Sequence, residues 1–293
     1  MKFNLFKRKR EKFALTLMGG GARGLSHIGV LDVLEENGLI PDIITGTSMG
    51  AIVGGLYASG LSPKKMEKLA FSLDLRNFIN APKIPIISNR LKKVSDYLIY
   101  EIYLSLLSRK RSLSEKDTVE EFLKDLVGDI KIEDLKIKFA CNAVDLVSGK
   151  EVVFDKGCLY KAIRASMSLP IIFEPVKIDD MVLVDGGALN NAPVDIAKKL
   201  GAEKTVLVDI HIPPKRVEAE KLSNTFLILE RILDSISYYL LEEKIKHADF
   251  IIRIPLNIDT LDFSEPLSII ERGREETRKI MPELKEFLGL HFR

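Results

Sequence analysis

The chain has 293 residues, of which 46% are hydrophobic and 29% are charged, and its formal net charge is +2. This balance is typical of globular proteins and excludes a disordered or fibrous chain, while the small net charge gives no reason to expect a nucleic-acid partner. The two cysteines, Cys141 and Cys158, are too few for a disulfide framework and belong to no metal-ligand pattern. We therefore expect no metal site and reduced thiols in a cytoplasmic protein.

The first twelve residues form a basic tail. Phe3, Leu5 and Phe6 lie among six basic residues, namely Lys2, Lys7, Arg8, Lys9, Arg10 and Lys12. A basic segment with apolar anchors binds the anionic inner face of a membrane, whereas a solvated, frayed terminus has the same composition. The sequence leaves both interpretations open. The apolar run that follows, residues 13–18, is shorter than the roughly 7–15 residues of a signal-peptide core.

The first hundred residues alternate between strand and helix patterns. Residues 13–18 read as a buried strand, residues 26–37 as a helix that ends at Gly38, and residues 42–45 as a second strand followed by a helix at 51–58. Residues 43–62 carry no charge, but Gly46 interrupts them, so a strand, a turn and a helix are preferred over a membrane span. This alternation predicts an α/β fold with three α/β/α layers and a mainly parallel central sheet.

The middle of the chain is predicted to be mostly helical. Ser62-Pro63 opens a helix that runs to about residue 73, and residues 91–107 have an amphipathic pattern. The insertion at residues 84–111 is either a cover over an active site or ordinary helical core, and the sequence does not decide between them. Thr118-Val-Glu-Glu121 has the form of a capping box and predicts a helix that starts there.

The second half returns to alternating elements. Residues 138–147 and 151–154 predict a hairpin around Ser148-Gly149. The remaining predicted elements are helices at 159–165, 193–200, 222–246 and 265–287, and strands at 181–184, 205–212 and 250–254.

The strongest chemical motif is Gly46-Thr47-Ser48-Met49-Gly50, a GxSxG turn between a predicted strand and a predicted helix. Glycines on both sides permit a sharp turn that presents the serine at the carboxyl edge of the sheet. There it also faces a helix N-terminus, whose dipole stabilises negative charge. This context predicts that Ser48 is a nucleophile.

A glycine-rich loop, Gly19-Gly20-Gly21-Ala22-Arg23-Gly24, also follows a strand and precedes a helix. Its backbone N–H groups can form an oxyanion hole, and Arg23 either holds a phosphate or braces the loop. The loop also fits the GxGxxG pattern of dinucleotide-binding proteins, which need an acidic residue about 20 positions further on, at the end of the second strand. Asp42 has that distance but precedes its strand, which weakens the nucleotide interpretation.

A third motif, Asp185-Gly186-Gly187, follows the strand predicted at 181–184 and brings a carboxylate to the same sheet edge. Together with the first two motifs and with the segment from Ala165 to Pro170, which contains Ser166, it resembles the patatin-like phospholipase family. The four segments occur in the family's order and span residues 13–212. The third position of the aspartate motif is Gly187 here, where many members of the family have alanine.

The resemblance implies an acyl-ester hydrolase of the phospholipase, lysophospholipase or carboxylesterase type. Ser48 would be its nucleophile, Asp185 its general base and Gly19–Gly24 its oxyanion hole, and no cofactor would be required. The implied domains are the tail at 1–12, a catalytic domain at 13–212 and a C-terminal extension at 213–293 packed on the same domain. Two other hypotheses remain, namely a nucleotide-binding regulator and a catalytically idle adaptor. A histidine base is a further alternative, and His27 or His211 could approach the sheet edge.

Overall fold

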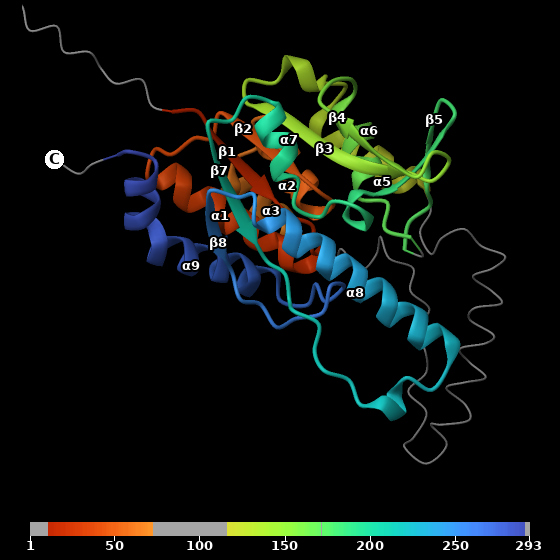
Figure 1. Ribbon diagram of the computed structural model, residues 1–293. Coiled ribbons are helices and arrows are strands. Elements are labelled where there is room, and N and C mark those ends of the chain that lie inside the picture. The colour runs from red at the N-terminus through yellow and green to blue at the C-terminus, as the bar shows by residue number, and fades with distance from the viewer. Residues whose placement is uncertain (1–10, 73–115, 171, 291–293) are drawn as a thin grey trace, which may run out of the picture.

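The computed structural model describes residues 11–72, 116–170 and 172–290 (Figure 1). Most of the predicted basic tail and the whole of the predicted insertion at 84–111 lie outside these residues. Both of these hypotheses therefore stay predictions.

The core of the described structure is a mixed sheet of eight strands. Neighbouring strands β3, β2, β1, β7 and β8 are parallel, whereas β4 and β6 run antiparallel to β3, and β5 runs antiparallel to β6. The strands are β1 (Phe13–Leu17), β2 (Ile43–Gly46), β3 (Lys138–Asp145), β4 (Lys150–Phe154), β5 (Val176–Ile178), β6 (Met181–Asp185), β7 (Lys204–Asp209) and β8 (Phe250–Arg253).

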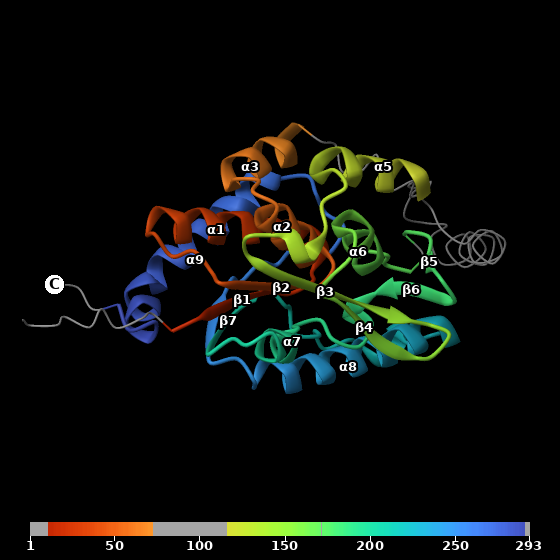
Figure 2. The ribbon, with the colours of Figure 1, turned by 90° about the horizontal axis from the view of Figure 1, so that it is seen from above.

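Helices cover both faces of this sheet, as Figure 2 shows. One face carries α1 (Ser26–Glu36), α2 (Met49–Ala58), α3 (Pro63–Ser72), α5 (Lys116–Val127), α6 (Leu159–Ser166) and α9 (Pro266–Phe287). The other face carries α7 (Val194–Lys199) and α8 (Thr225–Ile245). The predicted three-layer α/β/α fold with a mainly parallel sheet is confirmed.

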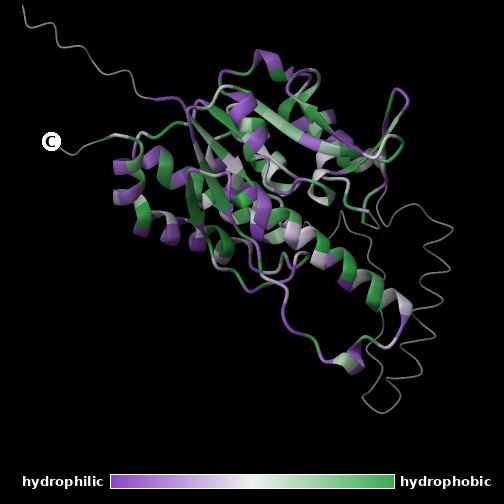
Figure 3. Cartoon of the chain, viewed as in Figure 1, coloured by the Kyte–Doolittle hydropathy of each residue, from purple (hydrophilic) through white to green (hydrophobic). Residues whose placement is uncertain are grey.

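The central strands of the sheet are runs of buried, mainly apolar residues that have no solvated face. Every residue of β1 is fully buried, and so are Val206, Leu207 and Val208 of β7. Strands covered by helices on both sides need such continuous apolar sequences, which is why their pattern does not alternate. Figure 3 shows this as largely green strands, whereas helices such as α9 have purple outer turns.

The C-terminal segment joins the same body as the rest of the chain. Strand β8 extends the sheet beyond β7, and α9 packs against α1. The two helices cross at a pair of glycines, because a Cβ on Gly29 would lie 2.1 Å from the carbonyl oxygen of Ile270, and one on Gly273 would lie 2.1 Å from that of Ser26. This backbone-to-backbone approach is possible only without side chains.

Some local predictions were wrong. The described part of α5 begins at Lys116, so Thr118 lies inside the helix and does not cap it. Strand β7 ends at Asp209 and not at residue 212, because Ile210 donates its N–H to the sulfur of Met18 instead of to a neighbouring strand. The three-residue strand β5 was not predicted. No helix in the described ranges is long and apolar enough to cross a membrane, and residues 43–62 form β2, α2 and the turns beside them.

Candidate active site

Ser48 occupies a tight turn between β2 and α2. Its backbone has a φ of 55° and a ψ of −121°, a conformation that side chains rarely adopt and that turns the residue out of the sheet. The turn needs glycine on both sides, because a Cβ on Gly46 would lie 2.4 Å from the carbonyl oxygen of Gly50, and one on Gly50 would lie 2.0 Å from that of Leu17. The N–H of Ser48 donates a hydrogen bond to Ser166 Oγ at 3.0 Å.

The register of β3 explains how Asp185 comes to lie beside Ser48. Cys141 pairs with both β2 and β4, and Asp145 pairs with both β4 and β6, so β2 and β6 must share one edge of β3. Strand β2 ends at Gly46, opposite Cys141, and the antiparallel β6 ends at Asp185, opposite Ala143. The two strand ends therefore face each other with one β3 residue, Asn142, between them.

This arrangement corrects the reasoning from sequence, which treated the strand before Asp185 as another strand ending at a common carboxyl edge. The carboxylate reaches the site because β6 runs in the opposite direction along the part of β3 that extends beyond β2. The juxtaposition expected of Ser48 and Asp185 is present, but antiparallel pairing produces it.

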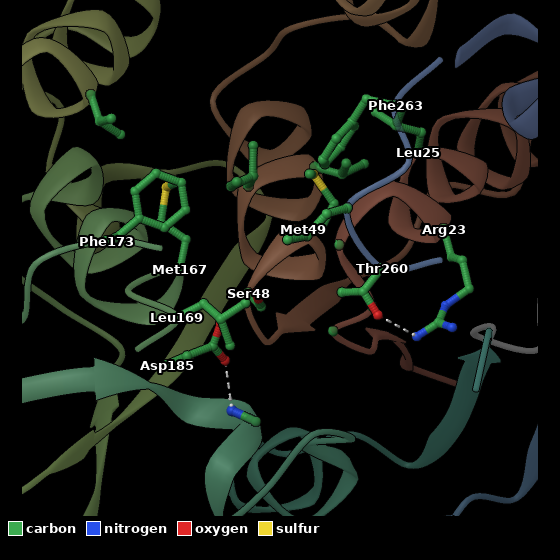
Figure 4. Close-up of a pocket in the computed structure, with 18 of the residues that line it drawn as sticks. Arg23, Leu25, Ser48, Met49, Met167, Leu169, Phe173, Asp185, Thr260 and Phe263 are labelled. Atoms are coloured by element: carbon green, nitrogen blue, oxygen red, sulfur yellow. Dashed lines mark hydrogen bonds between the residues drawn. The ribbon is translucent and has the colours of Figure 1, made fainter. Parts of the chain in front are cut away.

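The Asp185 carboxyl is almost completely buried at 5% exposure. It accepts the N–H of Gly187 at 2.8 Å (Figure 4). It also hydrogen-bonds the side chain of Ser48. Burial disfavours the charged form and raises the pKa of Asp185 to about 6, although the two hydrogen bonds partly offset this effect. A carboxylate with such a pKa is a stronger base than an exposed aspartate and is still mostly ionised at neutral pH.

The glycine-rich loop lies against the same turn, but not all its N–H groups are free. Gly19 donates to the carbonyl of Asn191 at 3.2 Å, and Ala22 donates to the carbonyl of Thr260 at 2.7 Å. Within the described residues, the N–H groups of Gly20 and Gly21 make no backbone hydrogen bond outside regular elements. The expectation that the whole loop supplies donors was therefore too broad, because Gly19 and Ala22 are already used.

The other residues of this loop are packed into place. The guanidinium of Arg23 points toward the segment at 258–260 (Figure 4), where it donates to the carbonyl of Ile258 and to Thr260 Oγ1, both at 3.4 Å. Burial lowers the pKa of Arg23, and nearby Asp259 partly offsets this effect. A Cβ on Gly24 would lie 2.5 Å from the side chain of Met49, so this glycine permits the loop to contact the serine turn.

Behind the serine turn lies a buried polar network that the sequence analysis missed. Thr47 Oγ1 donates to Asn142 Oδ1 at 2.7 Å. The Asn142 amide in turn donates to Glu151 Oε1 and to the carbonyl of Asn190, both at 2.9 Å, and the Asn190 amide donates to the same Glu151 oxygen at 2.8 Å. A signal was present, because Asn142 is a polar residue inside the otherwise apolar strand Phe139–Val144. This network ties the Ser48 turn to the Asp185 motif.

The sequence also pointed to four further residues, Ser166, Pro170, Gly186 and Gly187, and all four lie around Ser48 and Asp185. Gly186 packs on β3, since a Cβ there would lie 2.5 Å from the carbonyl oxygen of Asn142. Pro170 and Gly187 line the cavity described below. Ser166, at the end of α6, accepts the Ser48 hydrogen bond.

Neither candidate histidine is arranged to serve Ser48. His27 is fully buried and its Nε2 lies 2.8 Å from the carbonyl oxygen of Met18, while burial lowers its pKa to about 4 and keeps the ring neutral. His211 contacts Asp209 through Nδ1 at 2.5 Å and lies 3.5 Å from Glu242 through Nε2. Neither residue lines the cavity that contains Ser48.

Ser48 and Asp185 both line an apolar cavity of about 500 Å³. In Figure 4, Met167, Leu169 and Phe173 lie on one side of the pair, and Met49, Leu25 and Phe263 lie on the other. Helices α2, α3 and α5 supply further apolar walls, including Ile52, Val53, Leu56, Met66, Leu69, Leu123 and Leu126. Arg23 and Asp185 are its only charged lining residues in the described part of the chain.

The structure gives the nucleotide interpretation little support. Asp42, the residue expected to grip a ribose, lies at the amino end of β2 and accepts the N–H of Phe13 at 3.0 Å. It is therefore at the opposite edge of the sheet from the glycine-rich loop. Among the residues described, no three His, Cys, Asp or Glu side chains gather as metal ligands would.

Comparison with known proteins gives a consistent family match. The family model for patatin-like phospholipases matches residues 15–198. The lysophospholipase NTE1 of Candida albicans is 31% identical over 227 residues, and that of Saccharomyces cerevisiae is 32% identical over 227 residues. Each alignment covers 75% of this chain but only 15% and 12%, respectively, of the relative.

One further sequence relative and one solved structure are also similar to this chain. An NTE family protein of Mycobacterium bovis is 32% identical over 200 residues, which covers 68% of this chain and 49% of that protein. Among solved structures, VipD from Legionella pneumophila has a TM-score of 0.54 at 16% identity, covering 94% of this chain and 67% of that one. The structural match supports the fold alone.

Proposed function

Because the chain belongs to the patatin-like phospholipase family, we propose that it hydrolyses acyl esters of lipids, with Ser48 as nucleophile and Asp185 as general base. The observation that carries the proposal is that a serine in a sharp, glycine-flanked turn and a buried carboxyl of raised pKa share the wall of one apolar cavity. Neither histidine nor metal chemistry is needed for this arrangement to act on an ester.

The proposed reaction proceeds in two halves. As Ser48 Oγ attacks the ester carbonyl, Asp185 accepts its proton, and the tetrahedral intermediate then collapses with cleavage of the ester C–O bond. The leaving alcohol takes the proton from Asp185. A water molecule next attacks the acyl-enzyme, Asp185 accepts its proton and returns it to Ser48 Oγ, and the fatty acid leaves.

The charge on the tetrahedral oxygen needs hydrogen-bond donors. We assign this role to the N–H groups of Gly20 and Gly21, since those of Gly19 and Ala22 already have acceptors. Gly19 contributes by lacking a side chain, because a Cβ there would lie 3.1 Å from the Cβ of Ser48 and 2.3 Å from Asn191 Oδ1. Each well-placed oxyanion donor is worth roughly 3–4 kcal/mol of barrier.

The cavity favours a substrate with a long apolar acyl chain. Its volume of about 500 Å³ is within the range of small-molecule sites, and its walls offer few polar partners beyond the reacting groups. The yeast relatives are named lysophospholipases, but this chain spans less than a sixth of their length, so their substrate enters here as a proposal. We therefore propose lysophospholipids, or phospholipids, as the substrate class.

Turnover of an ester panel tests the proposal. Wild type should hydrolyse p-nitrophenyl esters and lysophospholipids, and Ser48→Ala should reduce turnover by at least 10⁴-fold. Thr277→Val, a buried change in α9 far from the cavity, should keep the activity. Turnover that survives in Ser48→Ala would refute the nucleophile, and a folded wild-type protein that hydrolyses no ester would favour an adaptor.

We also propose that the basic tail brings the protein to the cytoplasmic face of a membrane. The support is its composition of six basic residues around three apolar ones. Deleting residues 1–10 should weaken binding to anionic vesicles without changing turnover of a water-soluble ester. Unchanged vesicle binding would count against this role.

A further inference from the structure

A second cavity of about 670 Å³ adjoins the apolar one. The two cavities share six lining residues, which we call the seam, namely Gly19, Arg23, Gly187, Asn191, Ser237 and Thr260. Beyond the seam, the second cavity is lined mainly by the C-terminal part of the chain, with residues 211–217, the middle of α8 and residues 257–262. The reaction proposed for Ser48 and Asp185 gives this cavity no role.

The second cavity is lined by many charged side chains, whereas the first is lined mainly by apolar ones. Its lining carries three cationic and three anionic side chains, namely Arg23, Lys215, Arg231, Asp234, Asp259 and Asp262. Among the described residues, none of these six lies within ion-pair distance of an opposite charge. We call this second cavity the polar cavity. Both signs of charge therefore line one cavity without forming an ion pair, although Asp259 is near enough to Arg23 to stabilise its charge.

Both arginines of the polar cavity have unused hydrogen-bond donors. Arg23 Nε, at the seam, is buried and has no hydrogen-bond partner among the described residues. Arg231 donates one Nη2 hydrogen bond of 3.0 Å to the carbonyl of Lys215, which leaves most of its five N–H groups for other acceptors. An arginine with unused donors suits a phosphate oxygen, which accepts bidentate hydrogen bonds.

The position of the seam fits the path of a phospholipid. With the ester carbonyl at Ser48 and the acyl chain in the apolar cavity, the glycerol and head group must leave toward the polar side. Glycine keeps that passage open, since a Cβ on Gly187 would lie 3.0 Å from Asn191 Oδ1 and 3.1 Å from Asp185 Oδ1. The two cavities thus match the two ends of one amphipathic molecule.

We propose that the polar cavity is a subsite for a zwitterionic head group, a phosphodiester that carries a cationic amine. Arg23 at the seam and Arg231 hold the phosphate, and the carboxylates of Asp234, Asp259 and Asp262 face the amine. A head group with a phosphate alone would meet these three carboxylates without a partner for them, so it binds less well. This inference rests on the proposed function and specifies its substrate.

The test compares two substrates that differ only in the head group. A lysophosphatidylcholine and the monoacylglycerol with the same acyl chain are hydrolysed by wild type, Arg231→Gln and Asp234→Asn, two changes on one face of α8. We expect each variant to raise the KM for the lysophospholipid about 5–10-fold and to leave the KM for the monoacylglycerol within twofold. Glu243→Gln, also on α8 but paired with Lys246 outside the cavity, should change neither value.

Equal changes for both substrates, or no change for the lysophospholipid, would overturn the inference. A different result would contradict the proposed function, namely a wild-type protein that hydrolyses neither of the two lipids nor a p-nitrophenyl ester. Binding of glycerophosphocholine to Ser48→Ala, measured by calorimetry, tests the cavity without turnover. Arg231→Gln should weaken that binding about tenfold, and an absence of binding at 10-fold molar excess over millimolar protein would also overturn the inference.

Discussion

The backbone N–H of Ser48 is held by the hydroxyl of Ser166, at 3.0 Å, from the end of α6. Ser48 has a strained, positive φ, and such a conformation persists only where surrounding contacts fix it. Ser166 lies 118 positions further along the chain and is fully buried. The turn that presents Ser48, the proposed nucleophile, is therefore fixed by long-range packing as well as by its own glycines.

Ser166→Ala should lower kcat about tenfold and leave KM nearly unchanged. The substitution leaves the Ser48 N–H without its acceptor, which costs about 1–3 kcal/mol in stability and loosens the turn. Steady-state kinetics and thermal unfolding measure the two effects. Ser59→Ala, which removes a hydroxyl bonded to the Leu56 carbonyl at the far end of α2, should leave kcat unchanged. Equal kcat in all three proteins would exclude a positioning role for Ser166.

The pH dependence of kcat/KM should report the ionisation of Asp185. Burial raises the pKa of this carboxyl to about 6, and only its ionised form accepts the Ser48 proton. Activity should therefore fall about tenfold per pH unit below pH 6 and reach a plateau above about pH 7. A plateau that extends down to pH 4.5 would show that no group of this pKa acts as the base.

The same raised pKa predicts a stability gain for Asp185→Asn at high pH. The folded carboxyl titrates at about 6 and the unfolded one at about 3.8, so the wild type loses stability as pH rises through this window. Above this pH window, the free energy of unfolding of Asp185→Asn should exceed that of the wild type by up to about 3 kcal/mol. Below pH 4 this difference should vanish. Thermal unfolding of both proteins at pH 4 and pH 8 gives the comparison. A pH-independent difference would contradict a desolvated carboxylate.

Arg274 should contribute strongly to stability because it connects three helices. From α9 it donates to Asp32 of α1 at 2.7 Å and to Glu67 of α3 at 2.7 Å, and all three side chains are largely shielded from water. Arg274→Met leaves these carboxylates without their partner and should cost about 3–5 kcal/mol in denaturant unfolding. Arg272→Met, which breaks only partly exposed pairs within α9, should cost less than about 1 kcal/mol. Similar losses in the two variants would contradict this role.

Most of the architecture could be predicted from local pattern. The apolar runs at 13–18 and 42–45, each followed by a glycine-rich turn and a helix, specify parallel strands without any long-range information. The identity of Ser48 and Asp185 as candidates came from motifs at fixed spacing. Their juxtaposition was expected for the wrong reason, because strand direction depends on pairing partners, and β6 pairs antiparallel with the end of β3.

What the sequence could not provide depends on contacts between distant residues. Asn142, Glu151 and Asn190 lie up to 48 positions apart and become a network only when β3, β4 and the Asp185 motif fold together. The use of the Ala22 N–H by Thr260 is of the same kind, since 238 residues separate them. The polar cavity was equally hidden, because its charged residues belong to four separate segments.

The rate at which a fluorophosphonate labels the protein, followed by intact mass, tests the Ser48–Asp185 pair most directly. We predict one adduct per chain, located on Ser48, and a labelling rate at pH 7.5 that falls at least 100-fold in Asp185→Asn. Labelling of Asp185→Asn at the wild-type rate, or an adduct on any residue other than Ser48, would contradict this prediction.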